Sequence, residues 1–209
     1  LVMLAVIGTC SCFKTENTNL ASPQNGLPVP VVVFHGYGGT CDQPLVSYLA
    51  NHLQTYSVCI EPSGNPETAA DYSINTAILE QGRSACEMIN NNTALRGEFD
   101  LIGFSQGTIL SRYIIENCKL VGKVRNFIAF GGPLNGQSVN LCSFYDVFCI
   151  LKRWYDSSMV FTDKMQNSWA PAGYFKVPGY FQEYLEHSSF LAEANNEVNY
   201  SEARREKML

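Results

Sequence analysis

Strand-like and helix-like hydrophobic patterns alternate along the first two thirds of the chain. The run Val29–Phe34 is apolar on both faces, which is typical of a central strand in a parallel sheet. Pro44–Gln54 places apolar residues at helical spacing, and Tyr56–Ile60 predicts the next strand. Further elements follow in the same order, with helices expected at Ile74–Ile89 and Thr108–Cys118 and strands at Phe99–Phe104 and Phe127–Phe130. This alternation predicts an α/β fold with a mainly parallel sheet.

The sequence pattern changes after Pro133, where the regular spacing of apolar residues ends. Residues 141–190 contain thirteen of the chain's twenty-five aromatic residues and both of its tryptophans. A segment of this kind, inserted after a strand, is expected to form a cap over the carboxyl-end edge of the sheet, and we place the cap at residues 135–200. Part of it is expected to face the substrate; the alternative is an ordinary secondary hydrophobic core.

One pentapeptide carries a nucleophile motif. Gly103-Phe-Ser-Gln-Gly107 follows a predicted strand and precedes a predicted helix, which is the setting of a nucleophile elbow. The glycines allow a sharp turn, and the free N–H groups of the following helix point to the same place. The motif predicts that Ser105 is a catalytic nucleophile; the alternative is a serine that caps a tight turn.

A serine that attacks an acyl carbon needs backbone N–H groups to bind the oxyanion. One donor is expected from Gln106, the residue after the nucleophile. The glycine-rich stretch His35–Gly39 follows the first predicted strand, where the second donor normally lies, and Tyr37 is the expected donor. A phosphate cradle is the alternative for this stretch, but the Lys-Ser/Thr pair of a P-loop does not follow it.

The serine also needs a histidine base and a carboxylate, in the chain order serine, acid, histidine. His35 and His52 precede Ser105, so His187 is the one histidine of this sequence in the expected order. The acids that could orient it are Asp146, Asp156, Asp163 and Glu183. However, His187 lies in the predicted cap without a strand and a glycine-rich loop around it. A packed or solvated histidine is therefore favoured over a general base.

Composition and charge narrow the class of protein. Of the 209 residues, 46% are apolar and 16% are charged, which is enough for a packed core and excludes a disordered chain. The formal net charge is −5 and the sequence has no basic run, so a nucleic-acid partner is excluded. Arg204, Arg205 and Lys207 alternate with glutamates and predict the solvated side of a helix. No metal or organic cofactor is expected, because the predicted chemistry does not need one.

The N-terminal run Leu1–Ile7 is apolar and ends in small and polar residues, as the hydrophobic part of a secretory signal peptide does. We therefore expect a partial signal peptide at residues 1–12; the alternative is a buried first strand. The run is too short to span a bilayer, and stable membrane insertion is not expected. The protein is expected to enter the secretory pathway and to be lysosomal or secreted.

Cysteine usage agrees with an oxidising compartment. Of eight cysteines, Cys10 and Cys12 lie in or beside the expected signal peptide. The other six lack paired C-x-x-C spacing, so disulfides are favoured over zinc, and six cysteines allow fifteen pairings. Two sequons, at Asn91 and Asn199, predict N-glycosylation sites.

Several segments together resemble the lysosomal palmitoyl-protein thioesterases. The segments that carry the resemblance are Val32–Cys41, Gly103–Gly107, Ser111–Cys118, Phe130–Pro133, Trp169–Phe175 and Tyr184–Glu197. The resemblance runs from about Pro28 to the last residue and is most specific in the cap and in the placement of the cysteines. It implies an α/β-hydrolase domain over residues 28–209, with the cap as an insertion.

The resemblance also implies roles for single residues. Ser105 is the implied nucleophile, with oxyanion N–H groups from Tyr37 and Gln106. Asn199 falls where the family can carry a glycan.

Three disulfides are expected from the same resemblance. The family implies Cys86–Cys118 and Cys142–Cys149. The counterpart of Cys41 tends to have a cysteine neighbour in the family, whereas Asp42 follows it here. The remaining pair, Cys41 and Cys59, is therefore expected to form the third bridge.

The implied reaction is hydrolysis of a fatty-acyl thioester on a protein cysteine, so fatty-acylated proteins or peptides are the expected substrates. The family continues past the position of Leu209 through further strands, whose loops carry the Asp and His of the triad. Both ends of the chain are thus expected to be incomplete, and the 209 residues alone to be inactive. The rival functions are a lipase or carboxylesterase that cleaves oxygen esters and a non-catalytic lipid-binding relative.

Overall fold

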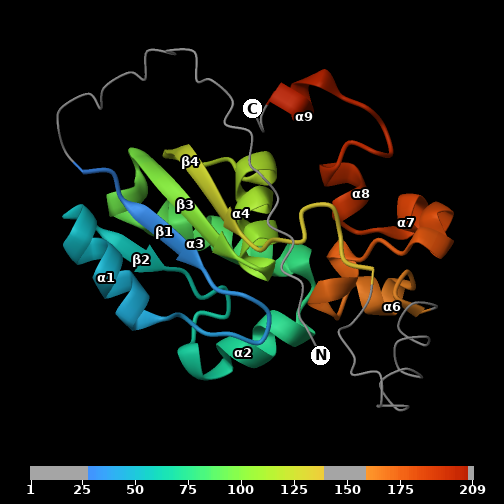
Figure 1. Ribbon diagram of the computed structural model, residues 1–209, viewed down its shortest axis with the longest axis horizontal. Coiled ribbons are helices and arrows are strands. Elements are labelled where there is room, and N and C mark those ends of the chain that lie inside the picture. Colours follow the sequence, from blue (N-terminus) through green and yellow to red (C-terminus); the bar gives the residue numbers. More distant parts are fainter. Residues whose placement is uncertain (1–27, 139–158, 207–209) are drawn as a thin grey trace, which may run out of the picture.

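The computed structural model describes residues 28–138 and 159–206, and in them four parallel strands form one sheet (Figure 1). The strands are β1 (Val31–Phe34), β2 (Ser57–Cys59), β3 (Glu98–Phe104), which the 3-10 helix η1 (Thr93–Leu95) precedes, and β4 (Lys123–Phe130). Their spatial order is β2-β1-β3-β4. The chain thus adds β2 on one side of β1 and then crosses back to add β3 and β4 on the other side. The predicted α/β class with a parallel sheet is confirmed.

The strand register brings the ends of β1, β3 and β4 to one edge of the sheet. Phe34, the last residue of β1, pairs with Gly103, and Phe104 at the end of β3 pairs with Phe130. Loops at the carboxyl ends of parallel strands form the ligand sites of open α/β sheets. The glycine-rich loop after β1 and the turn after β3 therefore meet at this edge.

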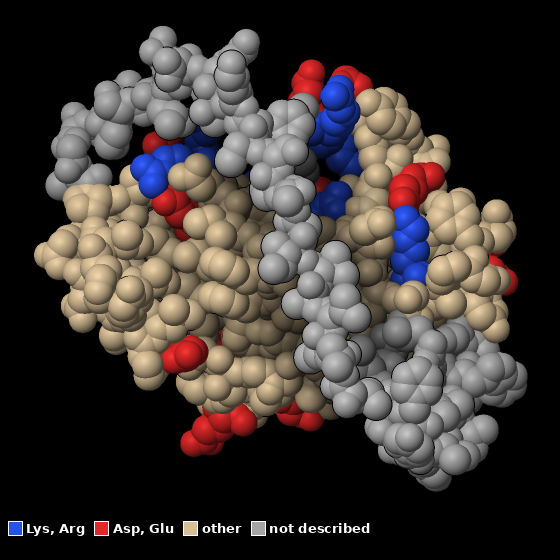
Figure 2. All heavy atoms as spheres, viewed as in Figure 1, with Lys and Arg blue, Asp and Glu red and all other residues tan. Residues whose placement is uncertain are grey.

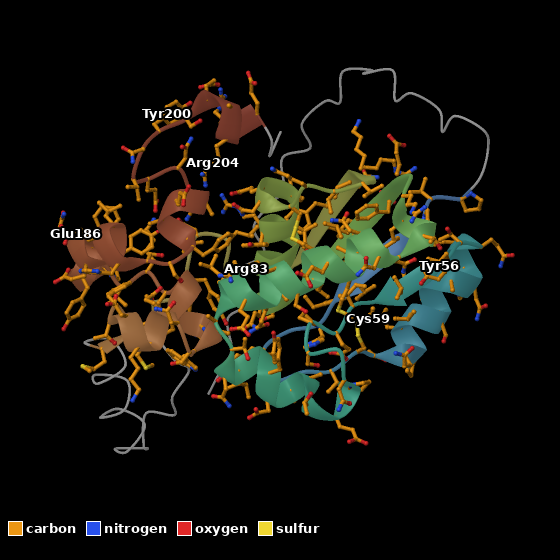
Figure 3. The ribbon with its side chains drawn as sticks, turned by 180° about the vertical axis from the view of Figure 1, so that it is seen from behind. Tyr56, Cys59, Arg83, Glu186, Tyr200 and Arg204 are labelled. Atoms are coloured by element: carbon orange, nitrogen blue, oxygen red, sulfur yellow. A yellow bond between two sulfur atoms is a disulfide. The ribbon has the colours of Figure 1, made fainter. Side chains whose placement is uncertain are left out.

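Helices cover both faces of the sheet. On one face, α1 (Gln43–Leu53) packs Leu45 and Leu49 against a small buried cluster of β1 and β3. On the other face, which is turned toward the viewer in Figure 3, α3 (Ile78–Asn91) and α4 (Gln106–Asn117) cover the main hydrophobic core. Successive residues of β1 alternate between the two clusters, because side chains of a strand point to opposite faces.

The helix predicted at Ile74–Ile89 is confirmed for most of its length but begins too early in the prediction, because the chain forms two helices here. α2 (Pro66–Asn75) begins at a proline, and the Asn65 side chain caps it by accepting a backbone N–H at 2.9 Å. The backbone is extended at Thr76, and α3 begins shortly after it. The buried Gln81 amide donates to Thr76 O at 2.7 Å and so satisfies a carbonyl that a continuous helix would have bonded.

β4 lies at one edge of the described sheet and presents apolar side chains. It begins earlier than the strand predicted at Phe127–Phe130, because its polar first half hides the strand pattern. Ile128 and Phe130 are 43% and 52% exposed. The Phe130 ring stacks on Phe104 with the ring centroids 5.0 Å apart. This edge is therefore apolar next to the site.

Residues 159–206 form short helices that pack beside α3 and α4 (Figure 1). They are α6 (Asp163–Gln166), η2 (Ala170–Tyr174), η3 (Pro178–Tyr180), α7 (Phe181–His187), α8 (Leu191–Ala194) and α9 (Glu202–Glu206). Tyr174, Tyr184 and Phe190 are buried in the same hydrophobic cluster as the strands. Aromatic residues in this part of the predicted cap therefore extend the core of the sheet.

Acidic and basic side chains lie together in the upper part of the face shown in Figure 2, whereas its lower edge carries acidic side chains. Arg205 is exposed on α9 and pairs with Glu202, whereas Arg204 turns inward and pairs with Glu193. The predicted solvated face of this helix is thus only partly exposed. No helix within residues 28–138 and 159–206 is long and apolar enough to cross a membrane.

Candidate active site

Ser105 lies in a sharp turn between β3 and α4. Its backbone angles are φ +50° and ψ −117°, a region in which a residue with a Cβ atom is strained. The turn is held by a hydrogen bond from Ser105 N–H to Phe130 O at 2.8 Å, and the residue is exposed. A strained, exposed serine between a strand and a helix is the geometry of a nucleophile elbow.

The two glycines that flank Ser105 are required by close backbone contacts. A Cβ atom on Gly107 would lie 2.4 Å from Phe34 O, and one on Gly103 would lie 2.6 Å from Gly107 O. Both distances are far below van der Waals contact, so a side chain at either position would push β1, β3 and α4 apart. The pentapeptide pattern is thereby explained by packing at the elbow.

The glycine-rich loop after β1 lies directly against Ser105. A Cβ atom on Gly36 would be 3.1 Å from the Cβ of Ser105 and 3.8 Å from its Oγ. Gly38 has φ +65° and donates its N–H to Ser73 Oγ at 2.9 Å, which ties the loop to α2. Within the described ranges, no residue accepts a hydrogen bond from the backbone N–H of Tyr37 or of Gln106. Both groups are therefore available to a bound oxygen atom.

The Gln106 side chain is buried and held from two sides. Its amide donates to Ser73 O at 2.8 Å, and its Oε1 accepts the hydroxyl of Tyr174 at 2.8 Å. Burial raises the pKa of the Tyr174 phenol above its usual value, so the hydroxyl remains a donor at physiological pH. Sequence reasoning identified the backbone of Gln106 and missed this anchor, because Tyr174 lies 68 residues away and the sequence alone does not connect it with the elbow.

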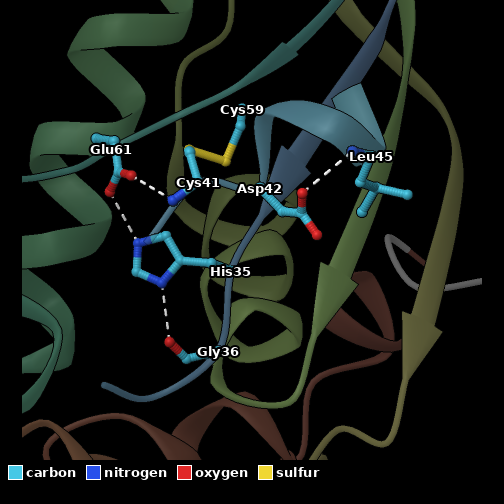
Figure 4. Close-up of a disulfide and its surroundings, with 7 residues drawn as sticks. All are labelled: His35, Gly36, Cys41, Asp42, Leu45, Cys59 and Glu61. Carbon is cyan, nitrogen blue, oxygen red and sulfur yellow. Dashed lines mark hydrogen bonds and ion pairs between the residues drawn. A yellow bond between two sulfur atoms is a disulfide. The ribbon is translucent and has the colours of Figure 1, made fainter. Parts of the chain in front are cut away.

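His35 lies beside the loop with its side chain 10% exposed, and it is paired with Glu61 (Figure 4). Its Nε2 lies 2.9 Å from Glu61 Oε2, and its Nδ1 lies 2.8 Å from Gly36 O. Glu61 is 7% exposed, and its other carboxylate oxygen accepts the N–H of Cys41 at 2.5 Å. Sequence reasoning did not single out Glu61; a lone acid directly after a predicted strand was the available signal.

Two disulfides are present in the described residues. Cys41–Cys59 joins the end of the glycine-rich loop to β2, with Cα atoms 5.7 Å apart. Cys86–Cys118 joins α3 to the end of α4, with Cα atoms 5.8 Å apart. Both pairs are those expected. The remaining expectations on cysteines, the pair Cys142–Cys149 and the signal peptide with Cys10 and Cys12, lie outside the described residues.

The other two histidines of the chain, His52 and His187, lie at the surface. His187 is half exposed at the end of α7, with Nε2 3.9 Å from the Glu186 carboxylate, and His52 stacks on Tyr48 at the surface of α1. No hydrogen bond links either histidine to Ser105 in the described ranges.

Two of the four acids considered as partners of His187 lie in the described residues. Asp163 begins α6 and Glu183 lies in the first turn of α7. Asp146 and Asp156 lie outside the described residues. The sequon asparagines Asn91 and Asn199 are both exposed, so a glycan at either would not displace the core.

A parallel sheet with helices on both faces, and a strained serine at the carboxyl end of a central strand, define the α/β hydrolases. The chain belongs to the palmitoyl-protein thioesterase family: the family described as palmitoyl protein thioesterase matches residues 30–209.

Individual relatives agree with this membership. The chain is 31% identical to palmitoyl-protein thioesterase 3 of Dictyostelium discoideum over 80% of this chain and 56% of that protein. It is 27% identical to palmitoyl-protein thioesterase 1 of Caenorhabditis elegans over 87% of this chain and 63% of that protein. It is also 30% identical to lysosomal thioesterase PPT2-B of Xenopus laevis over 57% and 40% of the two chains. The chain thus spans less than two thirds of the length of each of these relatives.

Proposed function

We propose that the protein hydrolyses the thioester bond between a long-chain fatty acid, such as palmitate, and a protein cysteine. The observation that carries the proposal is the strained, exposed Ser105 against the glycine-rich loop, in a chain of the palmitoyl-protein thioesterase family. The names of the relatives support the thioester as the bond that is cleaved.

In the proposed mechanism, Ser105 Oγ attacks the carbonyl carbon of the thioester. A base takes the serine proton and returns it to the departing cysteine sulfur, which leaves as a thiol. The carbonyl oxygen becomes an oxyanion and binds to the N–H groups of Tyr37 and Gln106. Removal of one such donor typically costs about 3–4 kcal/mol of transition-state stabilisation. Water then attacks the acyl-enzyme and releases the fatty acid.

His35 is unsuited to be the base, although it lies near Ser105. Both of its ring nitrogens are engaged, one with Gly36 O and one with Glu61. We therefore propose that the base and its carboxylate come from outside residues 1–209, as the family resemblance implies.

The substrate side of the proposal concerns the acyl chain and the cap. Each buried CH₂ group contributes about 0.8 kcal/mol, so a long acyl chain needs an apolar groove. We propose that residues 135–200 form a cap on a hydrolase domain at 28–209 and contribute to this groove. Tyr174 and Tyr184 are buried in the protein core, so other apolar residues of the cap would contact the lipid.

We further propose that the protein matures in the secretory pathway, with glycans at Asn91 and Asn199. Support comes from two disulfides, which persist in oxidising compartments, and from a relative named as a lysosomal thioesterase.

The test uses the protein expressed from its complete reading frame, with a palmitoyl-thioester peptide and the matched oxygen ester as substrates. Ser105→Ala is expected to abolish thioester hydrolysis and labelling by a fluorophosphonate. Ser47→Ala, an exposed serine on α1, is the matched control. Faster turnover of the oxygen ester would identify a lipase or carboxylesterase. Lipid binding without turnover or labelling would identify a non-catalytic relative.

A further inference from the structure

The carbonyl oxygen of Gly36 is held by two donors in the glycine-rich loop. His35 Nδ1 lies 2.8 Å from it, and the N–H of Gly39 donates to it at 3.1 Å. The peptide unit between Gly36 and Tyr37 is planar and trans, so its C=O and N–H point in opposite directions. Whatever holds Gly36 O therefore also sets the direction of the Tyr37 N–H, the proposed oxyanion donor.

Both nitrogens of the His35 ring have a partner. Nδ1 lies 2.8 Å from Gly36 O, and because a carbonyl oxygen can only accept, Nδ1 is the donor of this bond. Nε2 lies 2.9 Å from Glu61 Oε2, so Glu61 holds the far side of the ring. The ring therefore cannot turn without breaking one of the two contacts.

Glu61 also connects this pair to the far end of the loop. Its second carboxylate oxygen accepts the Cys41 N–H, and Cys41 is bonded to Cys59 in a disulfide. Within the loop, Gly38 donates its N–H to Ser73 Oγ of α2. The loop is thus held through His35, Gly38 and Cys41.

We propose that His35 and Glu61 are positioning residues that hold the Gly36–Tyr37 peptide and thereby orient the Tyr37 N–H toward the oxyanion. The inference rests on the proposed function of Ser105. Without Glu61, the His35 ring loses the partner of its Nε2 and the Cys41 N–H loses its acceptor. The contact between Nδ1 and Gly36 O is then no longer fixed, and the Tyr37 N–H loses its direction.

Glu61→Gln separates this role from a structural one. A glutamine amide can donate to His35 Nε2 while its oxygen accepts the Cys41 N–H, and Nδ1 keeps its hydrogen for Gly36 O. All the bonds around His35 then persist without the carboxylate. Glu61→Ala instead leaves His35 Nε2 and the Cys41 N–H without partners.

The experiment measures kcat and KM of the full-length protein on a palmitoyl-thioester peptide. Glu61→Gln is expected to keep both values close to those of the unmodified protein, because every bond around His35 persists. Glu61→Ala is expected to lower kcat about 10- to 100-fold with KM nearly unchanged, at most the loss of a whole oxyanion donor. Glu87→Gln, which replaces an exposed carboxylate on α3, is the control and leaves both values unchanged.

Two results would overturn the inference: an unchanged kcat in Glu61→Ala, or a loss in Glu61→Gln as large as in Glu61→Ala. If Glu61→Ala fails to fold, Glu61→Asp, with its shorter side chain, takes its place. If the unmodified protein does not cleave the thioester, the proposed function fails. The inference is then tested by the rate of fluorophosphonate labelling of Ser105 in the same variants, because the phosphonyl oxygen occupies the oxyanion position.

Discussion

Tyr174 donates its hydroxyl hydrogen to the side chain of Gln106, 68 residues earlier in the chain. Gln106 is also the first residue of α4 and the proposed source of one oxyanion N–H. The short helix η2 that carries Tyr174 thus anchors the residue next to the nucleophile. A contact made inside the core connects the segment after residue 159 with the candidate site.

Tyr174→Phe is expected to destabilise the protein and to lower its activity. The substitution leaves the buried Gln106 Oε1 without its donor, which typically costs about 1–3 kcal/mol. Urea unfolding measures the loss, and kcat should fall with it because α4 is less firmly held. Tyr48→Phe removes an exposed hydroxyl and should change neither quantity. Equal stability of the two variants would contradict the anchoring role.

Gly107→Ala is expected to be more damaging than alanine at an open glycine. The new Cβ atom would lie 2.4 Å from Phe34 O, a backbone atom that cannot rotate away. Overpacking of a tight site typically costs about 1–3 kcal/mol, and this variant should lie at or above the upper end. Gly97→Ala, where nothing lies within 4 Å, is the control. Thermal unfolding of both variants tests the prediction, which a normal melting temperature for Gly107→Ala would refute.

Loss of the Cys41–Cys59 disulfide is expected to affect stability and turnover together. The bridge closes a short loop with a sequence separation of 18, for which about 3 kcal/mol is typical. It also fixes the loop that carries Tyr37, so the double variant Cys41→Ser/Cys59→Ser should lose kcat at temperatures where it remains folded.

The second bridge provides the comparison for that prediction. Cys86–Cys118 closes a longer loop and joins α3 to the end of α4, away from the glycine-rich loop. Its double serine variant should lose comparable stability but keep kcat once folded. Equal kcat losses in the two double variants, measured at a temperature where both are folded, would contradict the prediction.

Arg112→Lys is expected to loosen the packing of α8 against α4. The Arg112 guanidinium donates to Glu116 at 2.6 Å and also to Asn195 and the carbonyl of Ala194. A lysine ammonium lacks the planar fork that serves these acceptors. Disruption of a buried pair typically costs about 3–5 kcal/mol when one partner is removed, so the milder Arg112→Lys should cost less than this.

The matched control for Arg112 lies on β4. Arg125 forms an exposed pair with Asp100, and pairs of this kind contribute about 0–1 kcal/mol. Arg125→Lys should therefore leave the urea midpoint nearly unchanged. A larger loss for Arg125→Lys than for Arg112→Lys would show that α8 is held by other contacts.

The fold class and the position of Ser105 could be predicted because their signals are local. An apolar run followed by glycine, or a pentapeptide between a strand and a helix, is contained within a few neighbouring residues. The break between α2 and α3 could not be predicted in the same way. It depends on the Gln81 amide reaching the carbonyl of Thr76 across the turn, while the helical spacing of apolar residues continues through it.

The residues that hold the candidate site in place could not be predicted from the sequence, for a related reason. Glu61 and Tyr174 act on His35 and Gln106 through contacts between segments that are distant in sequence. A single buried acid or tyrosine carries no motif, and its role emerges only when β1, β2 and η2 are assembled. Sequence reasoning therefore reached the residues proposed for the chemistry and missed those that hold them in place.

The register between β1 and β3 fixes the relative position of the two loops that form the site. The glycine-rich loop starts after Phe34 and the elbow follows Phe104, and the ladder that pairs Phe34 with Gly103 fixes their offset. A slip by one residue would move one strand end by about 3.3 Å relative to the other, more than the length of a hydrogen bond. The sheet thus fixes the distance between two peptide groups that belong to different loops. Their spacing is as rigid as the central ladder, even though each group lies in a turn.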